Sequence, residues 1–427
     1  MKFYIETYGC QMNVSDSELV TRILIDAGHV VAADIAEADL ILFNTCSVRD
    51  HAEQRVLGRI STEQPRKAGK PHLKIGVLGC MAQRLGKKLL DPKLGIDLVI
   101  GVDQYQHLPE LLDTFIDAQS ATDFEPAQLY PDLIPVHGGK TCGMVTIMRG
   151  CNNFCSYCIV PHVRGRERSR PWQEITKEVR VAVGNGMKDI TLLGQNVNSY
   201  HDGELDFPDL LKQIDLIPDL LRLRFITSHP KDLSPKLIDT MAGGRSICEH
   251  IHLAMQSGSN GILQRMNRKY TIEYYLDLVN RLRAAMPEIG LTTDLIAGFP
   301  GESDAEFEET LAAMEAIRFD YAFCFKYSNR EGTAAANYED QVPEAVRLER
   351  LKSMIDLQRR ITEEKYRAMI GKEVEVFVED FSRKSNAQVS GKTRDFKIAV
   401  LNGDQTMIGT LVKARVERAT AGTLICY

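Results

Sequence analysis

The stretch RGCNNFCSYCIVP, residues 149–161, places three cysteines in one short polar loop with the spacing CxxxCxxC. The loop follows an apolar strand-like run at residues 145–148, so Cys151, Cys155 and Cys158 are expected at the carboxyl end of a strand. Three thiolates from one loop can bind three corners of a cubane iron–sulfur cluster, because soft thiolate ligands select such clusters. A structural zinc site needs a closed set of four ligands, and no fourth cysteine follows nearby. The motif therefore predicts a [4Fe-4S] cluster with one iron open.

The region around this motif repeats a strand–helix pattern from residue 145 to residue 326. Such alternation is typical of parallel strands joined by crossover helices. Six units predict a partial (βα)6 barrel rather than a closed barrel of eight strands. A long charged helix at residues 344–369 is expected to close the region. The six strands are expected at residues 145–148, 190–193, 223–226, 251–255, 291–296 and 322–326.

Three apolar segments near the N-terminus each end in a cysteine. The segments KFYIETYGC, DLILFNTC and LKIGVLGC lead into Cys10, Cys46 and Cys80. Continuous apolar runs are typical of buried parallel strands, and the carboxyl ends of such strands share one edge of the sheet. The sequence therefore predicts an N-terminal α/β unit with a parallel sheet that brings three thiols to one rim. The helix after the first strand is expected to have Ser15 as its cap and to stop at Gly28.

The chain changes character after the long helix. Short strand-like runs such as KEVEVFVED and TMIGTLVKARVE are separated by Gly, Asn and Asp, which predicts a small antiparallel β-barrel of the kind that binds oligonucleotides. The hairpin RKSNAQVSGKTRDFK clusters basic residues around Phe396, and this combination suits single-stranded RNA. The alternative is a solvated hairpin with Phe396 in the barrel core. The predicted domains are residues 1–119, residues 137–369 and residues 371–427.

Composition limits the class of protein. Hydrophobic residues make up 44% of the chain and charged residues 26%, as in ordinary globular proteins, and no apolar run approaches the ~20 residues of a membrane span. Because Met1 and Lys2 lead directly into a strand-like segment, we expect no signal peptide and a cytoplasmic location. In that compartment the ten cysteines favour metal ligation or redox chemistry over disulfides. The net charge of −6 argues against general nucleic-acid coating but permits a local basic site.

Residues outside the two cysteine sets mostly fit structural roles. Cys324 and Cys426 lie within apolar strand patterns and are expected to be small core residues. Cys142 precedes the cluster strand and is a candidate for approaching the cluster. The histidines of CEHIH, His250 and His252, have the spacing of a metal tract, but no further ligand lies near them in sequence, so a structural role is favoured.

The cluster motif and the three-part layout resemble known enzymes. CxxxCxxC after the first strand of a six-strand barrel resembles the radical S-adenosylmethionine enzymes, whose three cysteines hold a [4Fe-4S] cluster with the open iron on S-adenosylmethionine. The resemblance implies one-electron cleavage to a 5′-deoxyadenosyl radical that abstracts hydrogen. A second cysteine triad before the barrel and a C-terminal barrel like a TRAM domain resemble the methylthiotransferases. Cys10, Cys46 and Cys80 match the ligands of their auxiliary [4Fe-4S] cluster.

Further stretches resemble the methylthiotransferases that act on tRNA. TYGCQMN, NTCSVRDHAEQ, LLGQNVNSY and QSGSNGILQRMNRKYT look like the group that converts N6-dimethylallyladenosine at position 37, next to the anticodon, to its 2-methylthio derivative. The resemblance implies two S-adenosylmethionine molecules (methyl donor and radical source), a flavodoxin- or ferredoxin-type electron donor, and a sulfur source. Enzymes for threonylcarbamoyl-adenosine tRNA or a ribosomal-protein aspartate are alternatives. The alternative from another class is a noncatalytic iron–sulfur RNA-binding protein. It is disfavoured because a cluster with an open iron would serve no purpose in such a protein.

Two groups of other residues are expected around the same rim. Residues at the ends of the second and fourth barrel strands are expected to bind S-adenosylmethionine, because barrel ligands gather at the carboxyl ends of strands; a plain βα turn is the alternative. These residues are Gly194, Gln195, Asn196, Gln256 and Ser257. A second group, beside the cysteines and in the C-terminal hairpin, is expected to contact RNA, with a solvated charged face as the alternative. These residues are Arg49, Glu53, Arg164, Arg166, Arg168, Lys392, Arg394 and Phe396.

Overall fold

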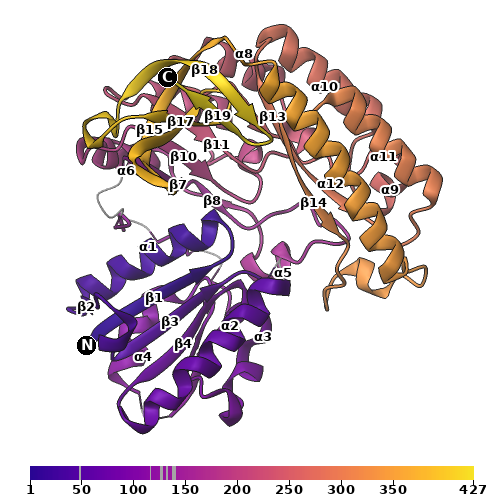
Figure 1. Cartoon of the computed structure of the whole chain (residues 1–427). Helices are drawn as coiled ribbons and strands as arrows, with labels where there is room; N and C mark the ends of the chain where they lie inside the picture. The colour runs from indigo at the N-terminus through magenta and orange to yellow at the C-terminus, as the bar shows by residue number, and fades with distance from the viewer. Residues whose placement is uncertain (48–49, 116, 126–127, 131–132, 137–140) are drawn as a thin grey trace.

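The computed structural model describes all residues of the chain except 48–49, 116, 126–127, 131–132 and 137–140. An N-terminal α/β unit lies in the lower half of the view and a larger α/β unit in the upper half, and the C-terminal strands pack on the larger unit (Figure 1). In the described part of the chain, no helix is long and apolar enough to cross a membrane.

The N-terminal unit contains the predicted parallel sheet, with the strand order β2-β1-β3-β4-β5-β6. The register aligns the carboxyl ends of three strands, because Tyr8 of β1 lies opposite Thr45 of β3 and Thr45 lies opposite Gly79 of β4. The sheet continues to Ala121, beyond the predicted domain end at residue 119. The strands are β1 Lys2–Tyr8, β2 Val30–Val31, β3 Leu40–Thr45, β4 Lys74–Gly79, β5 Leu98–Ile100 and β6 Gln119–Ala121.

Helices cover both faces of this sheet. One apolar core joins the sheet to α1 and α4, and a second joins it to α2 and α3. The prediction that Ser15 caps the first helix is wrong, because α1 begins at Gln11 with Cys10 as its N-cap residue. Ser15 lies inside the helix, and its hydroxyl is 2.9 Å from the hydroxyl of Thr146 in the larger unit. The helices are α1 Gln11–Asp26, α2 Asp50–Glu63, α3 Cys80–Leu85 and α4 Leu108–Asp113.

The larger unit is the predicted partial barrel of six parallel strands. Strands β7, β10 and β11 pair in one group and β12, β13 and β14 in another. Parallel bridges from Leu223 to Ile247 and from Ser228 to Leu253 connect the groups, which leaves β7 and β14 as the two edges. The strands are β7 Cys142–Thr146, β10 Asp189–Leu193, β11 Arg222–Phe225, β12 His250–His252, β13 Gly290–Ala297 and β14 Tyr321–Lys326, and β8 Met148–Arg149 pairs with β9 Arg168–Ser169 in a short hairpin.

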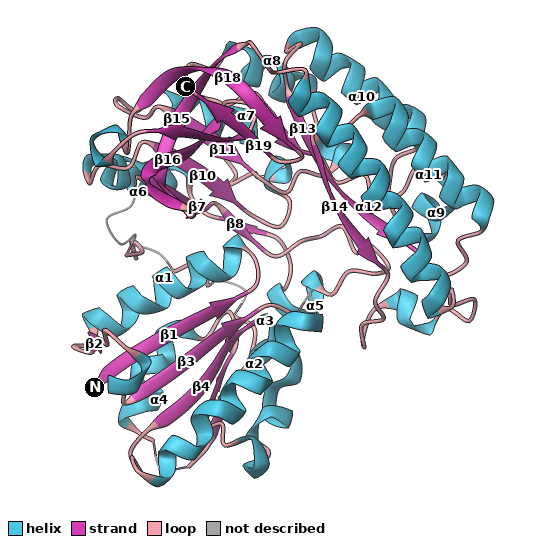
Figure 2. Cartoon of the chain, in the orientation of Figure 1, coloured by secondary structure: helices cyan, strands magenta, loops and turns pink. Residues whose placement is uncertain are grey.

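Helices cover the outer side of the barrel strands (Figure 2), and their apolar faces join the strands in the largest core of the molecule. The predicted closing helix is α12, which packs on β14 and reaches β18 of the C-terminal barrel. The helices are α5 Val160–Arg164, α6 Trp172–Gly184, α7 Phe207–Asp215, α8 Pro235–Gly243, α9 Asn260–Arg265, α10 Ile272–Ala285, α11 Asp304–Ile317 and α12 Glu344–Arg367.

The C-terminal strands close into a barrel in the order β15-β16-β17-β19-β18. The predicted antiparallel barrel is confirmed with one exception, because β17 and β19 pair in parallel. Cys426 is buried in the core of this barrel, as expected. The strands are β15 Glu373–Ser382, β16 Ser385–Thr393, β17 Ile398–Asn402, β18 Leu411–Thr420 and β19 Thr423–Cys426.

Candidate functional site

The first three cysteines meet at the carboxyl edge of the N-terminal sheet. Each follows the end of β1, β3 or β4, and Cys46 and Cys80 are buried. A hydrogen bond between the thiols of Cys10 and Cys46 is the main cause that lowers the pKa of Cys10 to about 6. Burial raises the pKa of Cys80, and the charge of Cys10 adds to this effect. The structure therefore brings the three thiols together, and their binding of a cluster stays a prediction.

A glycine before Cys80 shapes this rim. Gly79 has a φ of +86°, and a Cβ atom there would lie 2.4 Å from Oδ1 of Asn44. The Asn44 side chain is buried and donates to the carbonyl of Asn13 at 2.9 Å, while Nδ2 of Asn13 donates back to Oδ1 of Asn44 at 3.0 Å. The Cys10 thiol donates to Oδ1 of Asn13 at 3.3 Å. The asparagine pair thus braces two of the strand ends that carry thiols.

The second cysteine triad lies in the loop after β8. The backbone N–H of Asn153 donates to Sγ of Cys151 at 3.5 Å, and Nη1 of Arg268 donates to Sγ of Cys155 at 3.4 Å. Burial, followed by the charge of Cys155, raises the pKa of Cys158 to about 12. The Cys158 thiol therefore loses its proton more readily where a nearby cation compensates the charge, as a bound metal does.

The rim of the barrel carries strained backbone of the kind found at ligand sites. Phe154, Thr227 and Gln256 have φ values of 46°, 71° and 69°, in a region that residues other than glycine rarely adopt. Oε1 of Gln195 is buried without a hydrogen-bond partner in the described part of the chain. Both predicted glutamines therefore fit a ligand-binding role.

The other predicted cofactor residues have structural contacts. Nδ2 of Asn196 donates to Asp232 at 2.8 Å, and its Oδ1 accepts the backbone N–H of His229 at 3.1 Å. Ser257 is fully buried, with its hydroxyl 3.2 Å from that of Thr310. A Cβ atom at Gly194 would lie 2.5 Å from Cγ of Met148, so this glycine permits close packing. These three residues shape the rim, and contact with a cofactor stays a prediction for them.

The arginine-rich run RGRERSR lies between the two α/β units rather than on an open face. Arg164 is buried and its Nη2 is 2.8 Å from Oδ2 of Asp16. Arg168 donates to both carboxylate oxygens of Asp103 at 3.0 Å. The structure therefore corrects the expectation of RNA contact for Arg164 and Arg168, because both guanidinium groups are committed to carboxylates of the N-terminal unit. Arg166 is exposed, and Cζ of its guanidinium group lies 4.2 Å from the centre of the Phe154 ring. RNA contact by Arg166 stays a prediction.

Of the predicted RNA residues near Cys46, Arg49 lies outside the described residues. The Glu53 carboxylate accepts the hydroxyl of Ser47 at 2.7 Å and Nη2 of Arg84 at 2.6 Å. Glu53 therefore braces the segment after Cys46 against α3, which corrects its expected role in RNA contact.

The predicted RNA hairpin of the C-terminal barrel is docked on the amino-terminal end of the barrel strands. Phe396 stacks on His250, with ring centres 4.4 Å apart and an angle of 15° between the rings. Nη2 of Arg394 donates to Glu249 at 2.9 Å, and Lys392 pairs with a glutamate of β15. These contacts join the hairpin to the larger unit. RNA contact by Lys392, Arg394 and Phe396 stays a prediction, and the alternative that placed Phe396 in its own barrel core is wrong. A hydrogen bond of 3.0 Å between His250 and a threonine hydroxyl supports the structural role of CEHIH.

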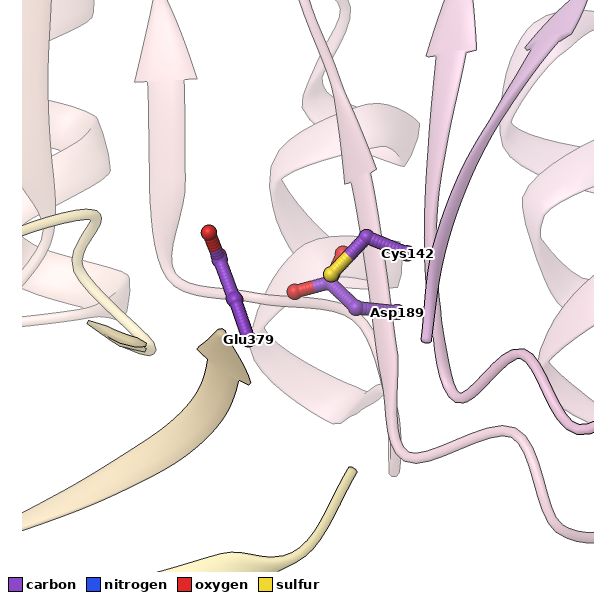
Figure 3. Close-up of side chains that lie close together, drawn as sticks. All are labelled: Cys142, Asp189 and Glu379. Carbon is purple, nitrogen blue, oxygen red and sulfur yellow. The ribbon is translucent and has the colours of Figure 1, made fainter. Parts of the chain in front are cut away.

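One further group of ligand-type atoms lies at this same end of the barrel, far from the cluster loop in the strand direction. Atoms of Cys142, Asp189 and Glu379 lie within 4.8 Å of one another, and Figure 3 shows the three side chains converging from separate strands. Asp189 accepts Nε of Arg224 at 3.1 Å, and Glu379 accepts Nζ of Lys392 at 2.6 Å. Burial raises the pKa of Cys142 to about 12. Both carboxylates are paired with cations, so the group is an interdomain contact, and Cys142 lies at the opposite end of the barrel strands from the cluster loop.

Asp16 and Arg268 are site residues that the sequence reasoning missed, and Arg149 is a further buried partner of Asp16. Asp16 offers a signal in retrospect, because it lies in the buried stripe of α1 between Met12 and Leu19. A carboxylate in an apolar stripe is costly unless it is paired, so its presence indicates a buried cation. No comparable pattern marks the two arginines.

Comparison with protein families divides the chain in three. Residues 145–314 match the radical SAM superfamily, residues 2–101 match the uncharacterized protein family UPF0004, and residues 367–425 match the TRAM domain. The chain is 46% identical over 433 residues to the tRNA-2-methylthio-N(6)-dimethylallyladenosine synthase of Bacteroides fragilis strain YCH46, which covers 99% of this chain and 94% of the relative. The protein of the same name from Thermoanaerobacter sp. strain X514 is 44% identical over 430 residues, with coverage of 99% and 91%.

Solved structures share the fold at low identity. The radical S-adenosylmethionine methyltransferase TsrM from Kitasatospora setae has a TM-score of 0.59 at 15% identity, over 78% of this chain and 77% of that chain. The cobalamin-dependent S-adenosylmethionine radical enzyme OxsB has a TM-score of 0.54 at 12% identity, over 84% and 56%. These similarities support the assignment of the barrel fold.

Proposed function

The chain belongs to the family of tRNA-2-methylthio-N(6)-dimethylallyladenosine synthases and is a radical SAM methylthiotransferase, and on this premise we propose that its two cysteine triads hold two [4Fe-4S] clusters with separate tasks. Its substrate is N6-dimethylallyladenosine at position 37 of tRNA. The observation that carries the proposal is the proximity of the two triads. Cys80 of the first triad packs in a buried apolar cluster with Ile159, which directly follows Cys158 of the second.

The donor sets suit clusters better than single ions. The ligand atoms of a single metal ion lie close together. Within the described residues, the three sulfur atoms of neither triad all lie within 4.8 Å of one another. A cubane is larger than an ion, so the sulfurs at its corners lie farther apart. Three thiolates per site also leave one iron free for another ligand. We assign Cys151, Cys155 and Cys158 to the radical cluster and Cys10, Cys46 and Cys80 to the auxiliary cluster.

Radical chemistry is required by the substrate, because C2–H of adenine is neither acidic nor electrophilic enough for acid–base substitution at neutral pH. When bound, the clusters would supply radical generation from one S-adenosylmethionine and a place for sulfur that another S-adenosylmethionine methylates. The protein's own residues bind and orient: Gln195 and Gln256 face the cofactor, and Arg166 contacts RNA. The TRAM barrel adds further RNA contact. A flavodoxin- or ferredoxin-type donor and a sulfur source are the external partners.

We also propose a cytoplasmic location. All ten cysteines are free in the structure, which suits a reducing compartment in which thiols remain available to metal clusters. The substrate tRNA is found in the same compartment.

The test separates the two triads by alanine substitution in anaerobically reconstituted protein. The variant Cys10→Ala/Cys46→Ala/Cys80→Ala should still form 5′-deoxyadenosine and should give no methylthiolated nucleoside. The variant of the other triad should lose cofactor cleavage altogether. Nucleoside mass analysis and iron content are the measurements, and Cys426→Ala is the matched control because this buried thiol lies in the C-terminal barrel. Methylthiolated product from the first variant would overturn the role of the auxiliary cluster.

A further inference from the structure

The short helix α5 connects the two cysteine triads. It spans Val160–Arg164, so it begins just after Cys158, and Figure 1 shows it at the junction of the two units beside α3. Its residue Val163 packs on Cys80, the first residue of α3. The same five-residue helix therefore links a ligand of one triad to a ligand of the other.

The last residue of α5 contacts a thiol directly. Nε of Arg164 donates to Sγ of Cys80 at 3.3 Å. Nη2 of the same guanidinium lies 2.8 Å from Oδ2 of Asp16, which holds the side chain in place from a neighbouring helix. The side chains of Arg164 and Asp16 are 4% and 0% exposed, so this contact is screened from solvent.

Asp16 alone does not balance the positive charges beside it. Arg149 also pairs with this carboxylate, at 2.9 Å from its Oδ1. In the described part of the chain, Asp16 is the one carboxylate ion-paired with either guanidinium, so two buried positive charges share one carboxylate. Burial of an uncompensated charge is costly, and a nearby anion removes that cost. The thiolates of Cys10, Cys46 and Cys80, which bind the metal of the cluster, supply that anion.

We propose that Arg164 is a positioning residue for the auxiliary cluster, which orients the Cys80 thiolate and contributes a buried positive charge to the cluster. The inference rests on the proposed function, since it requires a cluster on the first triad. Hydrogen bonds to ligand sulfurs and nearby positive charge both favour the reduced form of an iron–sulfur cluster, and they therefore raise its reduction potential. Arg164 also ties this property to the larger unit, because its helix belongs to the loop that carries Cys158.

Arg149 provides a matched control for this proposal. It is buried as Arg164 is and pairs with the same carboxylate, but its further contact is the ring of Tyr130, at 5.0 Å from the ring centre. Replacing either arginine by glutamine removes one positive charge and one partner of Asp16. The Arg164 variant additionally removes the hydrogen bond to Cys80.

The experiment uses the full-length Cys151→Ala/Cys155→Ala/Cys158→Ala protein, in which the auxiliary cluster is isolated. Iron content and an EPR-monitored redox titration are measured for this parent, for Arg164→Gln and for Arg149→Gln. We expect Arg164→Gln to have a lower midpoint potential or to retain less iron than the parent, and Arg149→Gln to remain close to the parent in both. Parental values for Arg164→Gln, or equal changes in the two variants, would overturn the proposal.

The outcomes distinguish this inference from the proposed function. A parent that holds no cluster would contradict both, whereas a parent with a normal cluster and an unchanged Arg164→Gln variant would contradict the inference alone. If Arg164→Gln does not fold by circular dichroism, Arg164→Lys takes its place. A lysine keeps the charge but cannot bond Asp16 and Cys80 with two separate nitrogens, so we expect reduced iron retention, and parental retention would refute the positioning role.

Discussion

Gly79→Ala tests how strictly the end of β4 is shaped for its thiol. Gly79 has a φ of +86° and a ψ of −155°, a backbone region that is essentially restricted to glycine, so an alanine there costs about 1–3 kcal/mol in strain. The new Cβ would also lie 2.4 Å from Oδ1 of Asn44 and 2.9 Å from the carbonyl of Thr45. Asn44 cannot move easily, because it is fully buried and its Nδ2 bonds both Asn13 and Ser17 at 2.9 Å. Overpacking of this kind costs about 1–3 kcal/mol, so the expected total is about 2–6 kcal/mol.

Gly28→Ala is the matched control. Gly28 has a nearly equal φ of +82°, but no atom lies within 4 Å of the Cβ position. The Gly28→Ala variant should therefore lose only the stability that backbone strain costs, about 1–2 kcal/mol. The excess loss in Gly79→Ala reports the stricter backbone of Gly79 together with the crowding at the thiol-bearing rim.

Hydrogen exchange of the β4 amides in metal-free protein, read by mass spectrometry, measures this opening free energy within the N-terminal unit. After anaerobic reconstitution, Gly79→Ala should also lose auxiliary iron, whereas Gly28→Ala should keep it. Equal exchange rates and full iron content in both variants would show that the asparagine pair yields to the new methyl group and that the rim is not rigid.

Three further predictions concern buried contacts. Burial raises the pKa of Asp16, but two adjacent arginine charges lower it below its ordinary value, so the stabilisation from this carboxylate is present above about pH 4 and is lost as the pH falls further. Asp16→Asn should therefore cost about 3–5 kcal/mol in urea unfolding at neutral pH, and this cost should shrink toward pH 3. A cost that does not change with pH would contradict the ion pair. Phe396→Ala removes the stack on His250 and should speed proteolysis between the barrel and the TRAM domain, and parental protection would show that the stack contributes nothing to docking. Arg268→Gln removes the donor to Cys155 and should lower iron retention by the radical cluster while the auxiliary cluster keeps its iron; equal losses from both clusters would point to general unfolding instead.

The local pattern of the sequence was sufficient for the elements and for the meeting of the thiols. Apolar runs of strand length predict parallel strands, and parallel strands in register bring the residues at their carboxyl ends to one edge, so Cys10, Cys46 and Cys80 meet without knowledge of any side-chain contact. The meeting of the thiols in the CxxxCxxC loop can be predicted from even less information, because all three lie within one short segment of chain. In both cases, short-range geometry decides the result.

The partners of the charged and aromatic side chains were decided by the tertiary structure alone. An arginine has the same identity in a sequence whether it faces solvent, RNA or a buried carboxylate, and the carboxylate that binds Arg164 lies 148 residues away in the chain. The side chain is long, so the packing of whole domains determines which group it reaches. Phe396 likewise stacks on a histidine of another domain. A basic or aromatic motif therefore indicates that a partner exists, and only the docking of the domains determines which partner it is, because that choice depends on contacts between segments far apart in sequence.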